Sequence, residues 1–384
     1  MSNRSNGRRP SGATDAATAE PDPIRRSIEV EYWVIDETGR LTEPGDLVDL
    51  PGAEREFIAP MLEIKTTPCE TSAELRAELC ERVAGVLRRA DRRGLGLVPL
   101  STPIAAGSIP DLPSERTRIQ DRVVGDRFEY VRRCAGTHIH VEQRPGHAVE
   151  QLNTLTALDP AVALVNSSPY FQGEPLAAGA RSLLYRRMAY DELPHQGQLW
   201  PYVDSREAWA RRLERRYREF KNEAIIAGVD PDTVDSAFEP EDAVWTPVKL
   251  RAAFSTVEWR SPDTALPSQI LRLADDIVGV VERALETSPR IEGDGGHLTD
   301  ESVVLPAFDT VEEHVEAAIR DGLGSDAVCA YLDRMGFDVE AYDPISAELQ
   351  PRGELSDAEA RDLRLEYADR LEADIRNARQ VHAD

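Results

Sequence analysis

The sequence predicts an α+β fold whose core is a largely antiparallel sheet. Strand-like segments dominate the first two-thirds of the 384 residues, and helical segments dominate the end. The two kinds of segment do not alternate regularly, as they would in a parallel sheet built from βαβ units. No repeat is visible along the chain, which argues against a solenoid or a propeller.

Two predicted strands come before the first predicted helix. Residues 27–35 are typical of a strand that ends in a turn at residues 36–39. A loop with two Pro-Gly pairs leads to a second strand, which ends near Thr67. A capping box at residues 71–74 then predicts a helix, because leucine and valine recur at helical spacing to about residue 92.

Strands and helices are mixed in the middle of the chain. Residues 94–100 are typical of a buried strand, and a further strand follows at residues 136–142 after a polar stretch that contains three prolines. Residues 147–165 are predicted to be helical, residues 166–173 to form a tight loop, and residues 206–228 to form a charged amphipathic helix.

The last third of the sequence is mainly helical. Two strands are predicted at residues 244–250 and 255–260, followed by a helix over residues 267–285. The glycines in residues 288–302 predict a flexible loop. The remainder is predicted to be helical and to end in a long helix that begins with a capping box at Ser356.

The N-terminal residues differ in composition from the rest of the chain. Residues 1–23 are small and polar and contain proline, so we expect a disordered tail followed by a single domain over residues 24–384. Arg8 and Arg9 are similar to a twin-arginine signal, but no apolar segment follows them, which argues against secretion. No apolar run approaches the ~20 residues of a membrane span. The sequence therefore predicts a cytoplasmic protein with no membrane partner.

The chain is strongly acidic. Its formal net charge is −25, from 45 basic and 70 acidic residues, and only three of the basic residues are lysines. Such a surface repels nucleic acid and anionic membranes, so neither is an expected partner. Acidic excess with few lysines favours a protein from a salt-loading halophile, where high ionic strength screens the repulsion. An acidic mesophilic protein is the alternative, but it explains the scarcity of lysine poorly.

The four cysteines show no C-x-x-C spacing and no metal-binding pattern. We expect them to be reduced, buried and structural. Cys134 is the only one near the candidate chemistry described next, which leaves a nucleophilic role open for it. The cysteines are Cys69, Cys80, Cys134 and Cys329.

Four predicted strands each carry two functional polar side chains at positions i and i+2. Alternation at period two puts each pair on one face of its strand, with apolar residues on the other face. For any one strand a solvated outer face is the simpler explanation. Four together favour a shared face lined with metal- and phosphate-binding groups. The pairs are Glu29/Glu31, Glu63/Lys65, His138/His140 and Glu258/Arg260.

These residue types favour magnesium chemistry. Mg²⁺ prefers hard oxygen ligands, and an inward-facing group of carboxylates would repel itself without Mg²⁺ or Mn²⁺. Zinc is disfavoured because no H-E-x-x-H motif or Cys/His pairing accompanies the histidines. Arg260 could hold a phosphate or a carboxylate with two hydrogen bonds. The candidate ligands are Glu29, Glu31, Glu56, Glu63, Glu258 and His138.

The sequence has no P-loop, no Rossmann glycine fingerprint and no kinase signature, so any nucleotide must bind through this face. Five motifs together resemble the glutamate–cysteine ligase family, and within it the second, carboxylate–amine ligase branch of the glutamine synthetase-like superfamily. The resemblance covers roughly residues 27–285. The motifs are S-I-E-V-E-Y at 27–32, E-x6-E-[IL]-x-T-x-P ending at Pro68, G-T-H-I-H-V at 136–141, N-S-S-P-Y-F-Q-G at 166–173 and T-V-E-W-R at 256–260.

The resemblance implies a catalytic domain with a curved antiparallel sheet, helices on its outer face, and a site for ATP and two or three Mg²⁺. The six candidate ligands would hold the metals, Arg260 the transferred phosphate, and His140 and Lys65 the nucleotide. His140 departs from the family's common pattern, which leaves its role open. Tyr185-Arg186 matches the position of a substrate-binding arginine, although the nearby Arg181 and Arg187 are alternatives.

The resemblance also implies a reaction. The γ-carboxylate of glutamate would attack the γ-phosphorus of ATP, and an amine would then displace phosphate from the acyl phosphate. Cysteine is the expected amine, although no residue visibly selects a thiol. Another amine acceptor, or a non-catalytic relative that binds nucleotide or metal, remains an alternative. The oligomeric state is left open, a homo-oligomer included.

Overall fold

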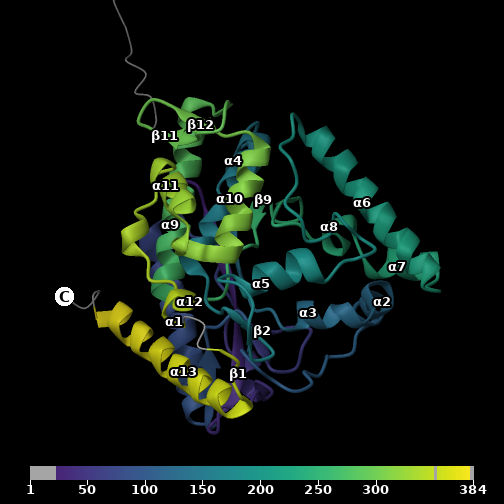
Figure 1. Ribbon diagram of the computed structural model, residues 1–384, viewed down its shortest axis with the longest axis vertical. Helices are drawn as coiled ribbons and strands as arrows, with labels where there is room; N and C mark the ends of the chain where they lie inside the picture. The colour runs from purple at the N-terminus through teal and green to yellow at the C-terminus, as the bar shows by residue number, and fades with distance from the viewer. Residues whose placement is uncertain (1–22, 350–352, 381–384) are drawn as a thin grey trace, which may run out of the picture.

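The computed structural model describes residues 23–349 and 353–380, and it is organised around a seven-stranded sheet (Figure 1). The sheet order is β2-β3-β1-β5-β9-β8, and β4 pairs with the second half of β1. Every pairing within this sheet is antiparallel, which confirms the predicted α+β fold. The strands are β1 Arg26–Asp36, β2 Ala53–Arg55, β3 Met61–Lys65, β4 Leu95–Val98, β5 Thr137–Glu142, β8 Val248–Arg251 and β9 Thr256–Trp259.

The central strand β1 has two unlike faces. One face carries Ile28, Val30, Tyr32 and Val34 in succession, and all four are buried. The other face begins with Glu29 and Glu31 and then changes to Trp33 and Ile35, which belong to a second apolar cluster. The polar part of the sheet is therefore confined to one half of β1 and the strands beside that half.

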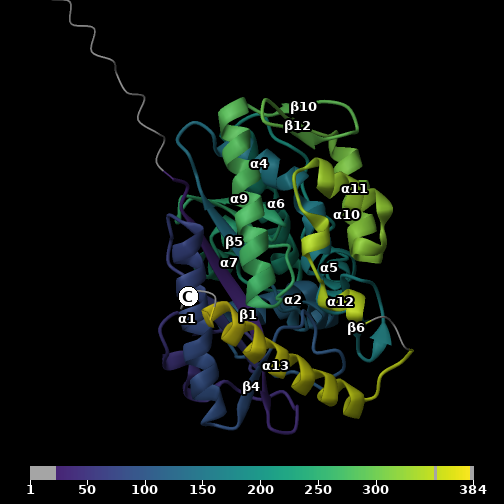
Figure 2. The same ribbon diagram turned by 90° about the vertical axis from the view of Figure 1, so that its left-hand side faces the viewer.

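Helices cover the apolar face of the sheet. In Figure 2, α1 (Ser72–Asp91) and α9 (Pro267–Thr287) lie in front of the strands, and α4 (Ala148–Ala157) packs against α9, β8 and β9. These helices contact β1, β3, β5, β8 and β9, and their apolar residues join the largest core cluster. The C-terminal α13 (Asp357–Gln380) packs beside α1 and β4. Burial of this face leaves the polar face of the sheet available for chemistry.

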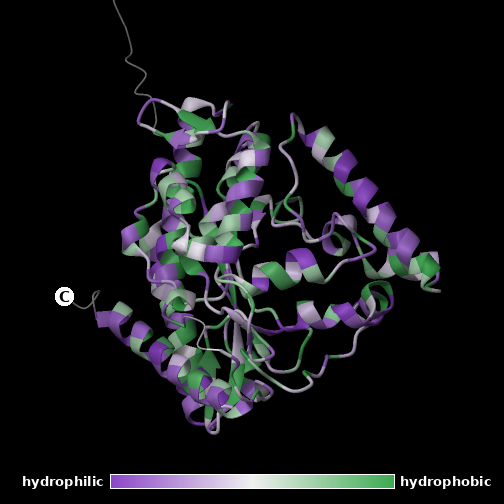
Figure 3. Cartoon of the chain, in the orientation of Figure 1, coloured by the Kyte–Doolittle hydropathy of each residue, from purple (hydrophilic) through white to green (hydrophobic). Residues whose placement is uncertain are grey.

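A second group of helices lies away from α1 and α9. The charged α6 (Arg206–Ile226) lies at the right of Figure 1 and is largely purple in Figure 3, which indicates its polar surface. The other helices are α2 Glu115–Val124, α3 Phe128–Arg132, α5 Ala180–Leu183, α7 Pro231–Ala237, α8 Pro240–Ala243, α10 Phe308–Asp321, α11 Asp326–Arg334 and α12 Ile345–Glu348. Within residues 23–349 and 353–380, none of the helices has the length and apolar character that a membrane crossing requires.

Local sequence signals placed most elements correctly. The capping boxes at Thr71 and Ser356 form as predicted, with each N-cap hydroxyl accepting from the backbone of the glutamate three residues on. The predicted helix 147–165 is α4 followed by a 3₁₀ segment from Asp159, where Pro160 lacks the backbone N–H that an α-helix needs.

Two local predictions were wrong. The polar stretch before residue 136 was given no helix, yet it contains α2 and α3, because Ser114 caps the segment after its prolines. The loop predicted at residues 288–302 contains β10 Arg290–Ile291 and β11 His297–Leu298, which pair with β12 Val303–Leu305. Apart from Pro23, the tail predicted at residues 1–23 lies outside the described residues.

Candidate metal and phosphate site

The polar side chains of the four predicted strands share one face of the sheet. Glu31 pairs with Glu63 across β1 and β3, and Glu29 pairs with His138 across β1 and β5. His140 pairs in turn with Glu258 across β5 and β9. Because directly paired residues point to the same side, the strand register alone brings these groups together.

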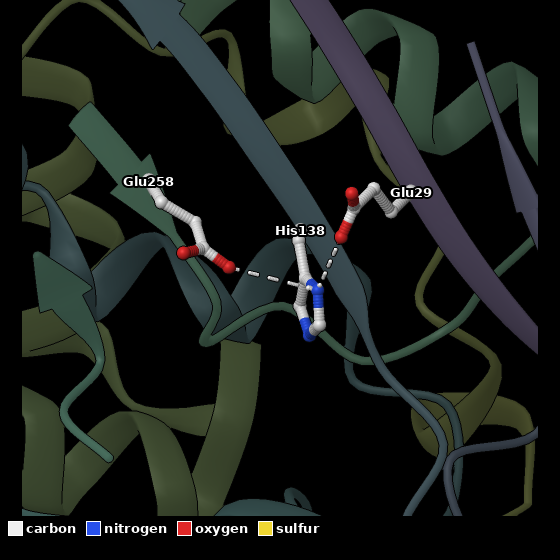
Figure 4. A group of neighbouring side chains, drawn as sticks. All are labelled: Glu29, His138 and Glu258. Atoms are coloured by element: carbon white, nitrogen blue, oxygen red, sulfur yellow. Dashed lines mark hydrogen bonds and ion pairs between the residues drawn. The ribbon is translucent and has the colours of Figure 1, made fainter. Parts of the chain in front are cut away.

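One group of possible metal ligands consists of Glu29, His138 and Glu258 (Figure 4). His138 Nδ1 lies 3.1 Å from Glu29 Oε2 and 3.8 Å from Glu258 Oε1. The three ligand atoms lie within 4.8 Å of one another, although the residues come from three different strands.

A second group consists of Glu31, Glu63 and His138, again with ligand atoms within 4.8 Å of one another. His138 Nε2 lies 4.0 Å from Glu31 Oε1, so the two ring nitrogens of this histidine face two different carboxylate groups. Glu31 is held by the backbone N–H of Gly136, which donates to Oε2 at 2.6 Å. Burial, and then Arg260, lower the pKa of His138, which favours the neutral imidazole that binds metals.

Several carboxylates lie close together in the site. Burial, and then repulsion from Glu31, raise the pKa of Glu56 to about 8. Burial, and then Glu56 and Glu29, raise the pKa of Glu63 well above its usual value. Both carboxyl groups are disfavoured as anions even with Lys65 beside Glu63. Glu258 Oε2 and His140 Nε2 are buried without a hydrogen bond. The residues therefore fit a divalent cation with oxygen and imidazole ligands.

Three cationic side chains contact Glu258, one at the oxygen that faces His138 and two at the other oxygen. Arg260 Nη1 lies 2.6 Å from Oε1, whereas Arg251 Nη1 and Lys249 Nζ lie 3.5 and 3.7 Å from Oε2. Burial alone would raise the pKa of Glu258, but Arg260 and then Lys249 hold it well below its usual value. Burial lowers the pKa of Lys249 to about 7. This part of the face suits an anionic phosphate.

Lys249 and Arg251 were not among the predicted site residues. Their strand was predicted at residues 244–250, and alternation at positions 249 and 251 was the signal that could have found them. Lys65 lies among carboxylates, and its predicted contact with the nucleotide stays a prediction. Its Nζ lies 2.7 Å from Glu63, 3.0 Å from Glu54 and 3.7 Å from Glu29.

The three candidate arginines lie in different places. Arg186 is buried, with Nη1 2.6 Å from Asp159 Oδ2 and Nη2 donating to Ser261 Oγ at 2.9 Å. Arg181 is also buried and donates to the backbone carbonyls of Arg260 and Ser261. Arg187 lies at the surface against α10. Arg181 and Arg186 thus hold the segment that carries Arg260, and their contact with a substrate stays a prediction.

The cysteines match the prediction in part, since Cys69 and Cys80 are buried whereas Cys134 and Cys329 are only partly buried. All four are free, and Cys134 Sγ donates to the carbonyl of Tyr130. Burial raises the pKa of Cys134 to about 12, so it is a thiol at neutral pH and a poor nucleophile. A cavity of about 360 Å³ between α1 and α13 contains none of the site residues. The chemistry of the side chains, rather than cavity size, locates the site.

Known proteins match this chain along most of its length. The model of the family described as Glutamate-cysteine ligase family 2 (GCS2) matches residues 13–360. The chain belongs to this family. Its members fall in the carboxylate–amine ligase class that the five sequence motifs indicated, so the family prediction is confirmed.

Relatives in this family come from several bacteria. A protein of Rhodococcus jostii (strain RHA1), provisionally named glutamate–cysteine ligase 2-1, is 24% identical over 377 residues, which cover 87% of this chain and 99% of the relative. A protein of Jannaschia sp. (strain CCS1), provisionally named glutamate–cysteine ligase 2, is 27% identical over 262 residues, covering 65% of this chain and 64% of the relative.

A solved structure shares the fold. The crystal structure of a bifunctional glutathione synthetase from Pasteurella multocida matches with a TM-score of 0.57 and 15% sequence identity. The match covers 91% of this chain and 53% of that enzyme, so the chain spans about half of its length. At this identity the likeness shows the fold alone.

Proposed function

We propose that this protein joins the γ-carboxylate of glutamate to the amine of cysteine at the expense of ATP, giving γ-glutamylcysteine, ADP and phosphate. The observation that carries the proposal is His138, whose two ring nitrogens face two carboxylate groups beside Arg260. A site of carboxylates, imidazole and arginine without a nucleophile suits phosphoryl transfer, which depends on positioning and charge neutralisation.

Mg²⁺ or Mn²⁺ would neutralise the phosphates of ATP when bound. The Glu29–His138–Glu258 group would hold one ion, and the Glu31–Glu63–His138 group with Glu56 would hold a second. We assign the transferred phosphate to Arg260, which is partly exposed at the edge of these groups. His140 and Lys65 are proposed to lie beside the nucleotide.

The reaction balances as two displacements. An oxygen of the glutamate γ-carboxylate bonds to the γ-phosphorus of ATP while the bond to ADP breaks. The nitrogen of the amine then bonds to the acyl carbon and loses a proton, while the carbon–oxygen bond to phosphate breaks. Arg260 stabilises the charge on the transferred group, and Arg181 and Arg186 keep its strand end in place. We propose that one of Arg181, Arg186 and Arg187 contacts glutamate.

A second candidate is a ligase for a different amine. An aromatic group of Tyr185, which is buried, and Tyr190 and Trp245, which are half-buried, lies close to the Arg260 side of the site. It carries no feature specific for a thiol. A pocket distinguishes small side chains by only about 1–3 kcal/mol, so residual use of 2-aminobutyrate, which resembles cysteine, is expected under the first proposal.

A substrate screen tests the proposal. Purified protein in molar KCl is given Mg-ATP, glutamate and a panel of amines, and ADP and amide product are quantified. Equal amounts of ADP and γ-glutamylcysteine support it. A rate with another amine about 10-fold above that with cysteine, a gap of about 1.4 kcal/mol, would establish the second candidate. Absence of ADP with every amine would identify a non-catalytic binding protein.

A further inference from the structure

The hairpin between β8 and β9 presents an aromatic ring to solvent beside the candidate site. Phe254 is 60% exposed. The other large apolar side chains exposed in residues 23–349 and 353–380 are aliphatic and lie on α6 and β10, namely Ile225, Ile226 and Ile291. A single exposed apolar side chain needs no explanation by itself, so the case for Phe254 rests on what holds it there.

The ring of Phe254 is held in place. Its centroid lies 6.1 Å from that of His140 in an edge-to-face arrangement, and the guanidinium carbon of Arg251 lies 5.1 Å from it. Ser255 has a φ of +53°, a left-handed conformation that is unusual for serine. Its carbonyl accepts from the backbone N–H of Gln143, which directly follows the neighbouring strand β5. The ring is therefore fixed at an exposed position, as a binding surface would be.

The two residues that hold the ring also reach the polar face of the sheet. His140 Nε2 lies 3.7 Å from Glu29 Oε2, and Arg251 Nη1 lies 3.5 Å from Glu258 Oε2. One side chain therefore separates the aromatic ring from the groups proposed to hold metal and phosphate. A ligand that fits both parts has a polyanionic end and a flat aromatic end, which describes a nucleoside triphosphate.

We propose that Phe254 is the stacking platform for the purine ring of ATP. This inference rests on the proposed function, since the phosphates must lie on the sheet face. Arg251 contacts one region of the ring, and the exposed remainder is open to a base. Stacking of a base on an aromatic side chain does not depend on hydrogen-bond readout, so a hairpin that offers only Phe254 suffices.

The test compares a ligand that has a base with one that lacks it. Binding of Mg-ATP and of inorganic tripolyphosphate with Mg²⁺ is measured by calorimetry for the wild type, Phe254→Ala, Phe254→Leu and Phe254→Trp. We expect Phe254→Ala and Phe254→Leu to weaken ATP binding on the order of 10-fold and to leave tripolyphosphate binding within about 2-fold. Phe254→Trp should retain ATP affinity. Ile291→Ala, an exposed apolar residue in a separate sheet, is the matched control.

The outcomes separate the inference from the proposed function. Unchanged ATP affinity in Phe254→Leu, or an equal loss of ATP and tripolyphosphate affinity, overturns the stacking role while leaving the ligase proposal standing. A wild-type protein that binds neither ligand overturns both. In steady-state assays, loss of the Phe254 ring should raise the KM for ATP and leave the KM for glutamate unchanged.

Discussion

Glu258 and Glu63 are both buried on the polar face, yet their surroundings have opposite charge. Glu258 lies among three cations, and its ionised form is favoured. Glu63 lies among carboxylates, with Lys65 as its cationic neighbour, and its ionised form is disfavoured. Replacement by glutamine should therefore have opposite effects at the two positions on the stability of the metal-free protein.

Glu258→Gln is expected to lower the free energy of unfolding by about 3–5 kcal/mol, because it leaves Arg260, Arg251 and Lys249 without the carboxylate that neutralises them. Glu63→Gln is expected to raise it, because burial disfavours the ionised form of Glu63, and Lys65 keeps Glu54 and Glu29 as charge partners. Denaturant unfolding in EDTA measures both. Both variants should also lose ligase turnover, since each removes a metal ligand. Stability shifts of the same sign would contradict this description of the site.

Arg260→Lys is expected to reduce kcat by about 100-fold, because lysine cannot make the paired hydrogen bonds that a guanidinium makes to a phosphoryl group. Arg320→Lys is the control, since Arg320 pairs with the adjacent Asp321 at the surface. The measurement is steady-state ADP release at saturating substrates. Activity of Arg260→Lys near that of the control would show that the transferred phosphate is bound elsewhere.

The segment from Gly136 to β5 depends on close packing against α5. A Cβ atom at position 136 would lie 2.1 Å from Arg181 Nη2, so only glycine leaves space for that guanidinium. Gly136→Ala should displace Arg181 from the carbonyls of Arg260 and Ser261 and lower kcat, while far-UV circular dichroism stays unchanged. Gly279→Ala in α9, where nothing lies within 4 Å, should leave kcat unchanged. Equal activity in the two variants would show that Arg181 does not position Arg260.

The sequence predicted most of the strands and the convergence of their polar faces, because alternation at period two fixes which side chains share a face. Strand order and register depend on pairs far apart in the chain, so they could not be predicted locally. The Asp159–Arg186 ion pair could not be predicted locally either, because the two residues lie 27 positions apart and each alone resembles a surface charge. Lys249 is a different case, because a lysine in a short strand resembles an ordinary solvated side chain, whereas here it is buried beside Glu258.

The excess of negative charge belongs to the whole molecule. At a net charge of −25, repulsion across the surface opposes the compact state, and salt reduces it because the Debye length falls from about 10 Å at 0.1 M to about 3 Å at 1 M. We expect the melting temperature to rise between 0.1 M and 2 M KCl, as measured by calorimetry. Sucrose of equal osmolality, which screens no charge, should produce a smaller rise. A melting temperature that is flat or falls in KCl would contradict the halophile prediction.

The position of β1 in the sheet bears on how the protein is made. β1 is an early segment of the chain, but one of its edges stays unpaired until β5 is synthesised. The free edge of β5 stays unpaired until β9 is synthesised. At translation rates of about 5–20 residues per second, the interval between β5 and β9 is on the order of ten seconds. During that time the nascent chain carries an unpaired, partly apolar strand edge, which is prone to aggregation. Lower growth temperatures, and chaperones that shield such an edge, should therefore raise the yield of folded protein more than a stronger promoter would.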